Sequence, residues 1–153
     1  MNPSILVNDT GADVEVRYEM YRYEIAPGKL AQCRFDSDPV RVAPTVVSGS
    51  SWRKATWEPL ENARYDRDTC AVEQVVKAGT SVWIETNGLC NDYRKYLERN
   101  PALRPTVPSL TVVSSAHKIE LKGWEVASAF EQRSGGACIL SLERLIASHH
   151  AGR

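Results

Sequence analysis

Four cysteines are residues of this chain whose type could do chemistry, as nucleophiles, metal ligands or disulfide partners. Cys33, Cys70, Cys90 and Cys138 lie at least 20 residues apart, so the chain has no C-x-x-C pair and no zinc-ribbon spacing. Cys33 and Cys138 alternate in phase with apolar neighbours, which predicts two buried side chains that act as small hydrophobes. Cys70 and Cys90 lie beside predicted turns and are the pair we expect to form a disulfide, although the sequence leaves three connectivities open.

The histidines and the glycine-containing turns give little support for catalysis. His117 lies in a polar turn between two predicted strands, while His149 and His150 lie near the C-terminus. A solvated surface histidine is the simpler interpretation of His117, and a Cys–His enzyme built on it is the alternative. The stretch 49–52 lacks the second glycine of a G-x-S-x-G elbow, and Gly135-Gly136 lacks the Lys-Ser/Thr of a phosphate-binding loop. The sequence therefore nominates no catalytic residue.

Two acidic turns, Asp36-Ser37-Asp38 and Asp66-Arg67-Asp68, offer pairs of carboxylates, the ligands that calcium prefers. Neither turn has the regular ligand spacing or the central glycine of an EF-hand, so ordinary charged loops are the simpler interpretation. A glycosidase needs two carboxylates across a cleft, and 19 acidic residues are too many for the sequence to nominate such a pair. We therefore predict no metal site and no cofactor.

Aromatic residues give the one positive indication of function. Four Trp and six Tyr against two Phe favour amphipathic rings, which are enriched at recognition surfaces. The predicted binding residues are Trp52, Arg53, Trp57, Tyr65, Tyr21 and Tyr23. Two other interpretations stay open: flat rings that stack on a sugar, and rings that simply fill the core.

The elements that position these residues are short β-strands. Val14, Val16, Tyr18 and Met20 alternate with charged residues, the period of a strand with one buried face. Strands are predicted over 4–8, 13–23, 30–35, 40–47, 71–77, 81–86, 109–114, 118–122, 124–132 and 137–142. We expect residues 8–11 to join the first two strands as a hairpin, a bulge near Met20, and a type II turn at Pro27-Gly28.

These short strands predict a mainly β fold, an antiparallel β-sandwich or a partly open barrel, in a single domain over residues 1–153. Short helices are predicted near 91–99 and after Leu142, an irregular aromatic segment over 48–70, and a frayed tail at 147–153. Pro44 predicts that the strand at 40–47 bends or runs along an edge, where a second chain could extend the sheet.

Charge and hydropathy narrow the class of partner. Nineteen basic residues balance 19 acidic ones, which disfavours a nucleic-acid partner. Apolar runs are too short for a membrane span and the N-terminus does not resemble a signal peptide, so we expect a cytoplasmic protein, or an exported one if Met1 replaces a removed signal.

The leading hypothesis is a non-catalytic protein that binds another protein, either an accessory or assembly subunit or a toxin-neutralising immunity protein. A carbohydrate-binding module is the first alternative, with carbohydrate in place of the protein partner. A small hydrolase of unrecognised type is the second.

Overall fold

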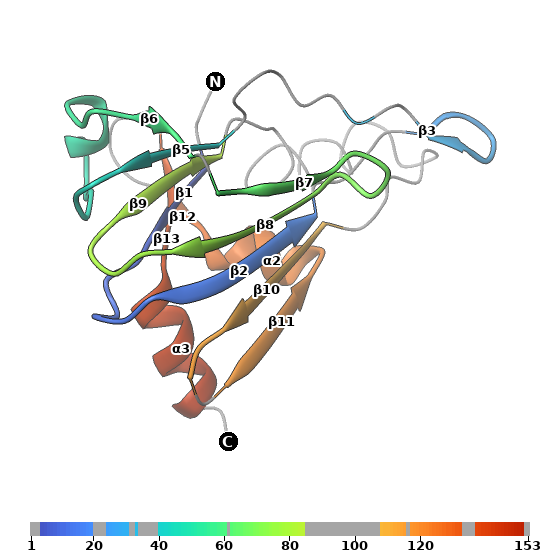
Figure 1. Cartoon of the computed structure of the whole chain (residues 1–153). Coiled ribbons are helices and arrows are strands. Elements are labelled where there is room, and N and C mark those ends of the chain that lie inside the picture. The colour runs from blue at the N-terminus through green and yellow to red at the C-terminus, as the bar shows by residue number, and fades with distance from the viewer. Residues whose placement is uncertain are drawn as a thin grey trace.

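Two β-sheets stacked face to face form the body of the molecule, and a C-terminal helix lies at one end of them (Figure 1). The computed structural model describes residues 4–19, 24–30, 33, 40–60, 62–84, 108–115, 117–132 and 137–151. The predicted mainly β sandwich is confirmed. The predicted helix at 91–99, the bulge near Met20 and Cys90 lie outside the described residues.

The first sheet, sheet A, is mixed because β1 and β13 run parallel while its other strand pairs are antiparallel. Its strands, in spatial order, are β12 (Glu131–Gln132), β13 (Cys138–Ser141), β1 (Ser4–Val7), β9 (Ser81–Ile84), β5 (Val40–Ala43) and β6 (Glu58–Pro59).

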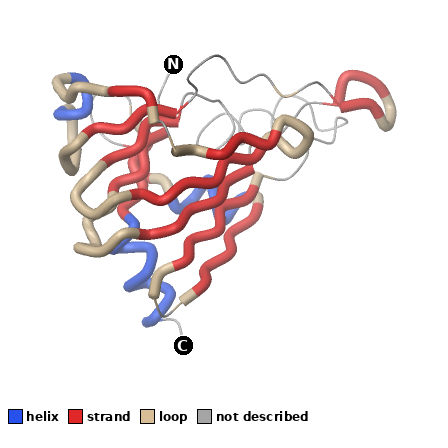
Figure 2. Tube along the Cα trace, in the orientation of Figure 1, coloured by secondary structure: helices blue, strands red, loops and turns tan. Residues whose placement is uncertain are grey.

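The second sheet, sheet B, is antiparallel throughout. Its strands, in spatial order, are β11 (Lys118–Lys122), β10 (Ser109–Val113), β2 (Val14–Glu19), β8 (Ala71–Val76) and β7 (Arg64–Asp66). Figure 2 shows a separate hairpin made by β3 (Glu24–Ala26) and β4 (Lys29–Leu30). Gly28 has φ +74° at its turn, as the Pro27-Gly28 prediction requires.

The predicted hairpin between 4–8 and 13–23 is wrong, because β1 belongs to sheet A and β2 to sheet B. All four residues of β1 are buried, so this strand needs cover on both faces and lies in the middle of its sheet. The connecting loop crosses between the sheets beside the β8–β9 turn. The buried Asn8 side chain holds this crossing, because its amide nitrogen donates to the carbonyls of Ala12 and Val76, each at 2.8 Å.

The core has two parts. The larger part lies between the sheets, and Tyr18, Leu6, Val72 and Leu110 in it are at most 1% exposed. The smaller part lies on the outer face of sheet A, around Ile5 and its neighbours. Burial on both faces of sheet A explains why β1 is apolar at successive positions, whereas β2 alternates.

The predicted strand at 124–132 is also wrong: residues Trp124–Ala129 form helix α2, and only β12 is extended. Val126 and Phe130 are four positions apart and both buried, a helical spacing that the alternating pattern concealed. The predicted C-terminal helix is confirmed as α3 (Leu142–Ala151), which buries Leu142 and partly buries Leu145 and Ile146.

The disulfide prediction is wrong in its pairing. Cys70 is bonded to Cys33, with 5.4 Å between their Cα atoms, and not to Cys90. Cys138, predicted as a buried thiol, is buried and also disulfide-bonded. Proximity to a turn did not identify the pair, because the bridge depends on how distant parts of the chain meet in space.

The strand at 40–47 is shorter than predicted and does not lie at an edge. β5 ends at Ala43, the chain bends at Pro44, and the strand lies between β9 and β6. The bend is therefore confirmed, and β5 is not a place where a second chain could extend the sheet.

Candidate functional site

The first part of the segment predicted as irregular, up to Trp57, folds over the outer face of sheet A, whereas its later part contains β6 and β7. Ser81 of β9 fixes its beginning: the buried hydroxyl accepts the N–H of Val47 at 3.1 Å and donates to the carbonyl of Thr45 at 2.8 Å. A 3-10 turn over Ser51–Arg53 follows. The segment covers Ile5, which would otherwise face water from the middle of the sheet.

Three tryptophans meet on this face. Trp83, from β9, lies directly opposite Ile5 of β1, and the rings of Trp52 and Trp57 contact Trp83 edge to face, with centroid distances of 5.8 and 5.4 Å. The Trp57 indole N–H donates to the carbonyl of Trp52 at 2.8 Å. Each such aromatic pair contributes about 0.5–1.5 kcal/mol beyond its burial. The three rings are therefore fixed relative to one another.

Two arginines lie over these rings. The guanidinium of Arg53 is 5.1 Å from the ring centroid of Trp52, and that of Arg41 is 5.7 Å from the ring of Trp83. Arg41 reaches Trp83 because β5 and β9 place these two residues directly opposite each other. We call Trp52, Trp57, Trp83, Arg41 and Arg53 the tryptophan–arginine cluster.

The structure brings together three of the six predicted binding residues, Trp52, Arg53 and Trp57. Tyr65 lies on β7, opposite Val72 of β8, in a row of sheet B that faces the sandwich interior. It is 37% exposed and belongs to the other sheet. Tyr21 and Tyr23 lie outside the described residues.

Sequence reasoning missed Trp83 and Arg41. Trp83 lies between Val82 and Ile84, whose side chains face the interior, and this alternation places the indole on the outer face. That signal was available in the sequence. The signal for Arg41 was not, because it depends on the register between β5 and β9.

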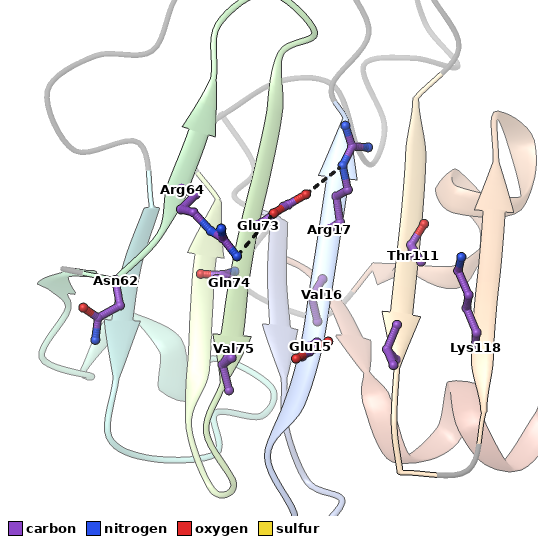
Figure 3. Close-up of a pocket in the computed structure, with 11 residues that line it drawn as sticks. Glu15, Val16, Arg17, Asn62, Arg64, Glu73, Gln74, Val75, Thr111 and Lys118 are labelled. Carbon is purple, nitrogen blue, oxygen red and sulfur yellow. Dashed lines mark ion pairs between the residues drawn. The ribbon is translucent and has the colours of Figure 1, made fainter.

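The outer face of sheet B forms an open groove of about 360 Å³ lined by five charged side chains together with polar and apolar ones (Figure 3). Arg17 of β2 pairs with Glu19 at 2.7 Å and with Glu73 at 3.3 Å, and Arg64 reaches the second oxygen of Glu73 at 3.7 Å. Exposed pairs of this kind contribute at most about 1 kcal/mol each. We interpret this face as solvated and balanced in charge.

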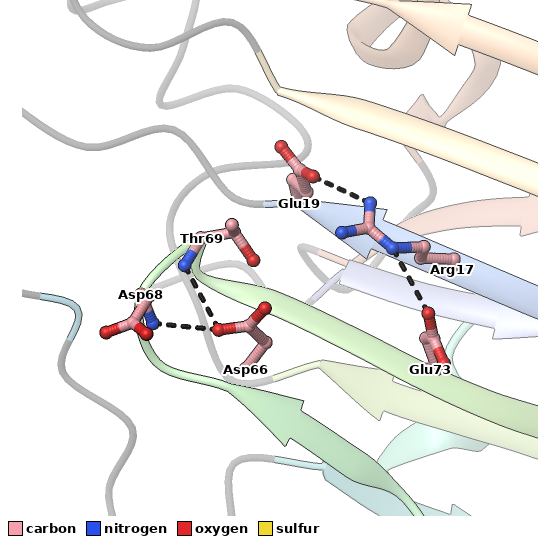
Figure 4. Close-up of polar contacts among 6 residues, drawn as sticks. All are labelled: Arg17, Glu19, Asp66, Asp68, Thr69 and Glu73. Carbon is pink, nitrogen blue, oxygen red and sulfur yellow. Dashed lines mark hydrogen bonds and ion pairs between the residues drawn. The ribbon is translucent and has the colours of Figure 1, made fainter.

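The acidic turn at 66–68 uses its first carboxylate for its own backbone (Figure 4). Asp66 Oδ1 accepts the N–H of Asp68 at 3.0 Å and the N–H of Thr69 at 3.4 Å. Hydrogen bonding from the Thr69 side chain, and then from these backbone groups, holds the pKa of Asp66 below its usual value. The carboxylate therefore stabilises the turn that leads into β8.

Groups with catalytic chemistry are scarce in the described part of the chain. Its cysteines, Cys33, Cys70 and Cys138, are all in disulfides, so none of them supplies a thiolate to His117. Burial raises the pKa of the Tyr18 hydroxyl well above its usual range, with Tyr65 contributing further. The described part of the chain holds no cluster of three or more His, Cys, Asp or Glu side chains that could bind a metal ion.

Comparison of the chain with models of protein families, with curated proteins and with solved structures gives no significant match. Within the described ranges, no helix is both long and apolar enough to cross a membrane.

Proposed function

We propose that this protein is a non-catalytic binding protein whose tryptophan–arginine cluster contacts a protein partner, as an accessory or assembly subunit or a toxin-neutralising immunity protein would. The observation that carries the proposal is the arrangement of three tryptophans and two arginines on one sheet face. Trp and Arg are the residue types that most often dominate the binding energy of protein interfaces. Rings held by edge-to-face contacts and by the Trp57–Trp52 hydrogen bond lose little conformational entropy on binding.

The positions of the arginines favour a protein over a carbohydrate. Sugar rings stack on open indole faces, but Arg53 and Arg41 lie over the rings of Trp52 and Trp83. Guanidinium groups offer several directed donors, which suit the carbonyl and carboxylate oxygens of a protein surface.

The test is affinity capture from the source cells with Arg41→Ala/Arg53→Ala as the site variant. Substituting the tryptophans themselves would expose the small core around Ile5 and confuse folding with binding. Arg64→Ala is the matched control, because the Arg64 side chain is 86% exposed on the other sheet.

We expect the native chain and Arg64→Ala to capture one protein in stoichiometric amount, and the double variant to bind it about tenfold or more weakly. Circular dichroism checks that all three chains fold. Equal capture by the double variant would refute the site, and the absence of any stoichiometric protein partner would refute the function.

We also propose that the protein works in an oxidising compartment. The Cys33–Cys70 bridge supports the exported alternative over a cytoplasmic one, because disulfides persist mainly outside reducing compartments. Peptide mapping of the protein from its source cells, with free thiols blocked at lysis, should recover the Cys33–Cys70 peptide. Recovery of both cysteines as blocked thiols would contradict this proposal.

A further inference from the structure

Among the residues that the structure describes, the longest edge strand of the two large sheets is β11. Sheet A ends in β12 and β6, which are two residues long, and the other edge of sheet B is β7, which is three. β11 has five residues, Lys118–Lys122, and Figure 1 shows it as the outermost strand of sheet B. Short edges resist pairing with other chains, whereas a long one presents a row of backbone donors and acceptors.

The hydrogen-bond pattern of the β10–β11 hairpin identifies the backbone groups at this edge. Ser114 and His117 bond to each other through both N–H groups, at 2.9 and 3.3 Å, and Gly123 donates to the carbonyl of Pro108 at 2.8 Å. Bonded and non-bonded pairs alternate in an antiparallel ladder, so Ile119 and Leu121 bond to β10. The backbone groups of the residues between them, Lys118, Glu120 and Lys122, therefore point away from the sheet.

One of these three positions is already used. The N–H of Lys122 donates to the carboxylate of Glu125 at 3.3 Å, which covers the end of the edge nearest α2. Within the described part of the chain, no hydrogen bond is found for the backbone groups of Lys118 and Glu120 on that side. The open edge is therefore centred on Ile119.

We propose that a second copy of this chain pairs with this edge, antiparallel, so that Lys118 lies opposite the partner's Glu120 and Glu120 opposite the partner's Lys118. Both members of each pair direct their backbone groups outward, which is what a bonded pair requires. Their side chains share one sheet face, where they already form an ion pair at 3.2 Å within each strand.

Charge excludes the neighbouring registers, and the hydrogen bond from Lys122 to Glu125 disfavours the register in which Glu120 lies opposite the partner's Lys122. Sliding the pairing by two residues would place Glu120 opposite the partner's Glu120 and Lys118 opposite the partner's Lys122, which are like charges. Sliding the pairing by one residue would place the buried Ile119 and Leu121 on the opposite face from the apolar side chains of the partner copy's sheet. In the proposed register Ile119 meets the partner's Ile119, and the buried layer continues across the junction.

The test uses charge reversal and sedimentation velocity over a range of protein concentrations. We expect the native chain to form a reversible dimer, and Lys118→Glu and Glu120→Lys each to raise its dissociation constant about tenfold or more, because each variant puts like charges opposite one another. An equimolar mixture of the two variants should dimerise, because opposite charges then face each other at both positions. The double variant should dimerise for the same reason.

Lys122→Glu is the matched control, because it makes the same charge change on the same strand outside the two complementary pairs, and it should leave the dissociation constant unchanged. A native chain that stays monomeric at every concentration refutes the proposal. This is also the result expected if a different protein, and not a second copy, occupies the edge. A dimer insensitive to both single reversals, or a mixture that stays monomeric, also refutes it. Capture by the tryptophan–arginine cluster is a separate readout, so failure of one proposal does not imply failure of the other.

Discussion

Asp66 gives a prediction at the scale of a single residue. Its ionised carboxylate is the hydrogen-bond acceptor of the 66–69 turn, and hydrogen bonding holds its pKa below the ordinary value of 3.8. A carboxylate with a depressed pKa contributes stability above its unfolded pKa, and this contribution is lost as pH falls through the folded pKa. We expect Asp66→Ala to be less stable than the native chain at neutral pH, with the difference disappearing in acid.

Urea unfolding at several pH values, with a carboxyl titration by NMR, measures both effects. Asp68→Ala is the control, because Asp68 contributes its backbone N–H, not its carboxylate, to this turn. A stability difference that stayed constant down to the acid limit would show that the Asp66 charge does not stabilise the turn.

Residue types predicted three of the five members of the tryptophan–arginine cluster. Trp52, Arg53 and Trp57 lie within six positions of one another, so a single loop could bring them together whatever the topology. Arg41 and Trp83 are 42 positions apart and meet only because β5 pairs with β9 in one register. A register of that kind is set by the whole sheet and is not encoded near either residue.

At the scale of elements, α3 depends on a residue far away in the sequence. Asp9, in the loop between the sheets, accepts the N–H of Glu143 at 2.9 Å and the hydroxyl of Ser141 at 2.5 Å, so its carboxylate caps the first turn of the helix. We expect Asp9→Ala to lower the free energy of unfolding by about 1 kcal/mol, measured by urea titration. Asp9→Asn keeps an acceptor oxygen and should lose less. Equal stability of the alanine variant and the native chain would contradict the cap.

The elements that the sequence misassigned share a physical cause. Residues 4–8 and 13–23 were predicted to pair because the turn between them suits a hairpin, yet β1 is apolar on both faces and can be satisfied only inside a sheet. Residues 124–132 carry apolar side chains at spacings that fit either a strand or a helix. Val126 is buried within α2 and Phe130 directly after its end, and this burial is a tertiary outcome.

At the scale of the whole molecule, the Cys33–Cys70 bridge ties the start of β8 to a part of the chain 37 residues earlier. A cross-link of that span restricts the unfolded chain, and the loop-entropy model assigns it about 3–4 kcal/mol. We expect Cys33→Ala/Cys70→Ala to lose about 3 kcal/mol of unfolding free energy in urea. Because Cys70 is buried and Cys33 packs against the main core, part of the loss will come from packing.

Comparing the native chain before and after reduction, with the double variant under the same reductant, separates the loss due to the cross-link from the loss due to packing. Reduction breaks this bridge and the disulfide of Cys138 in the native chain, but only the latter in the double variant. The reductant should therefore lower the midpoint of the native chain more than that of the double variant. A native chain whose midpoint is the same with the bridge intact and reduced would show that the fold does not depend on this cross-link.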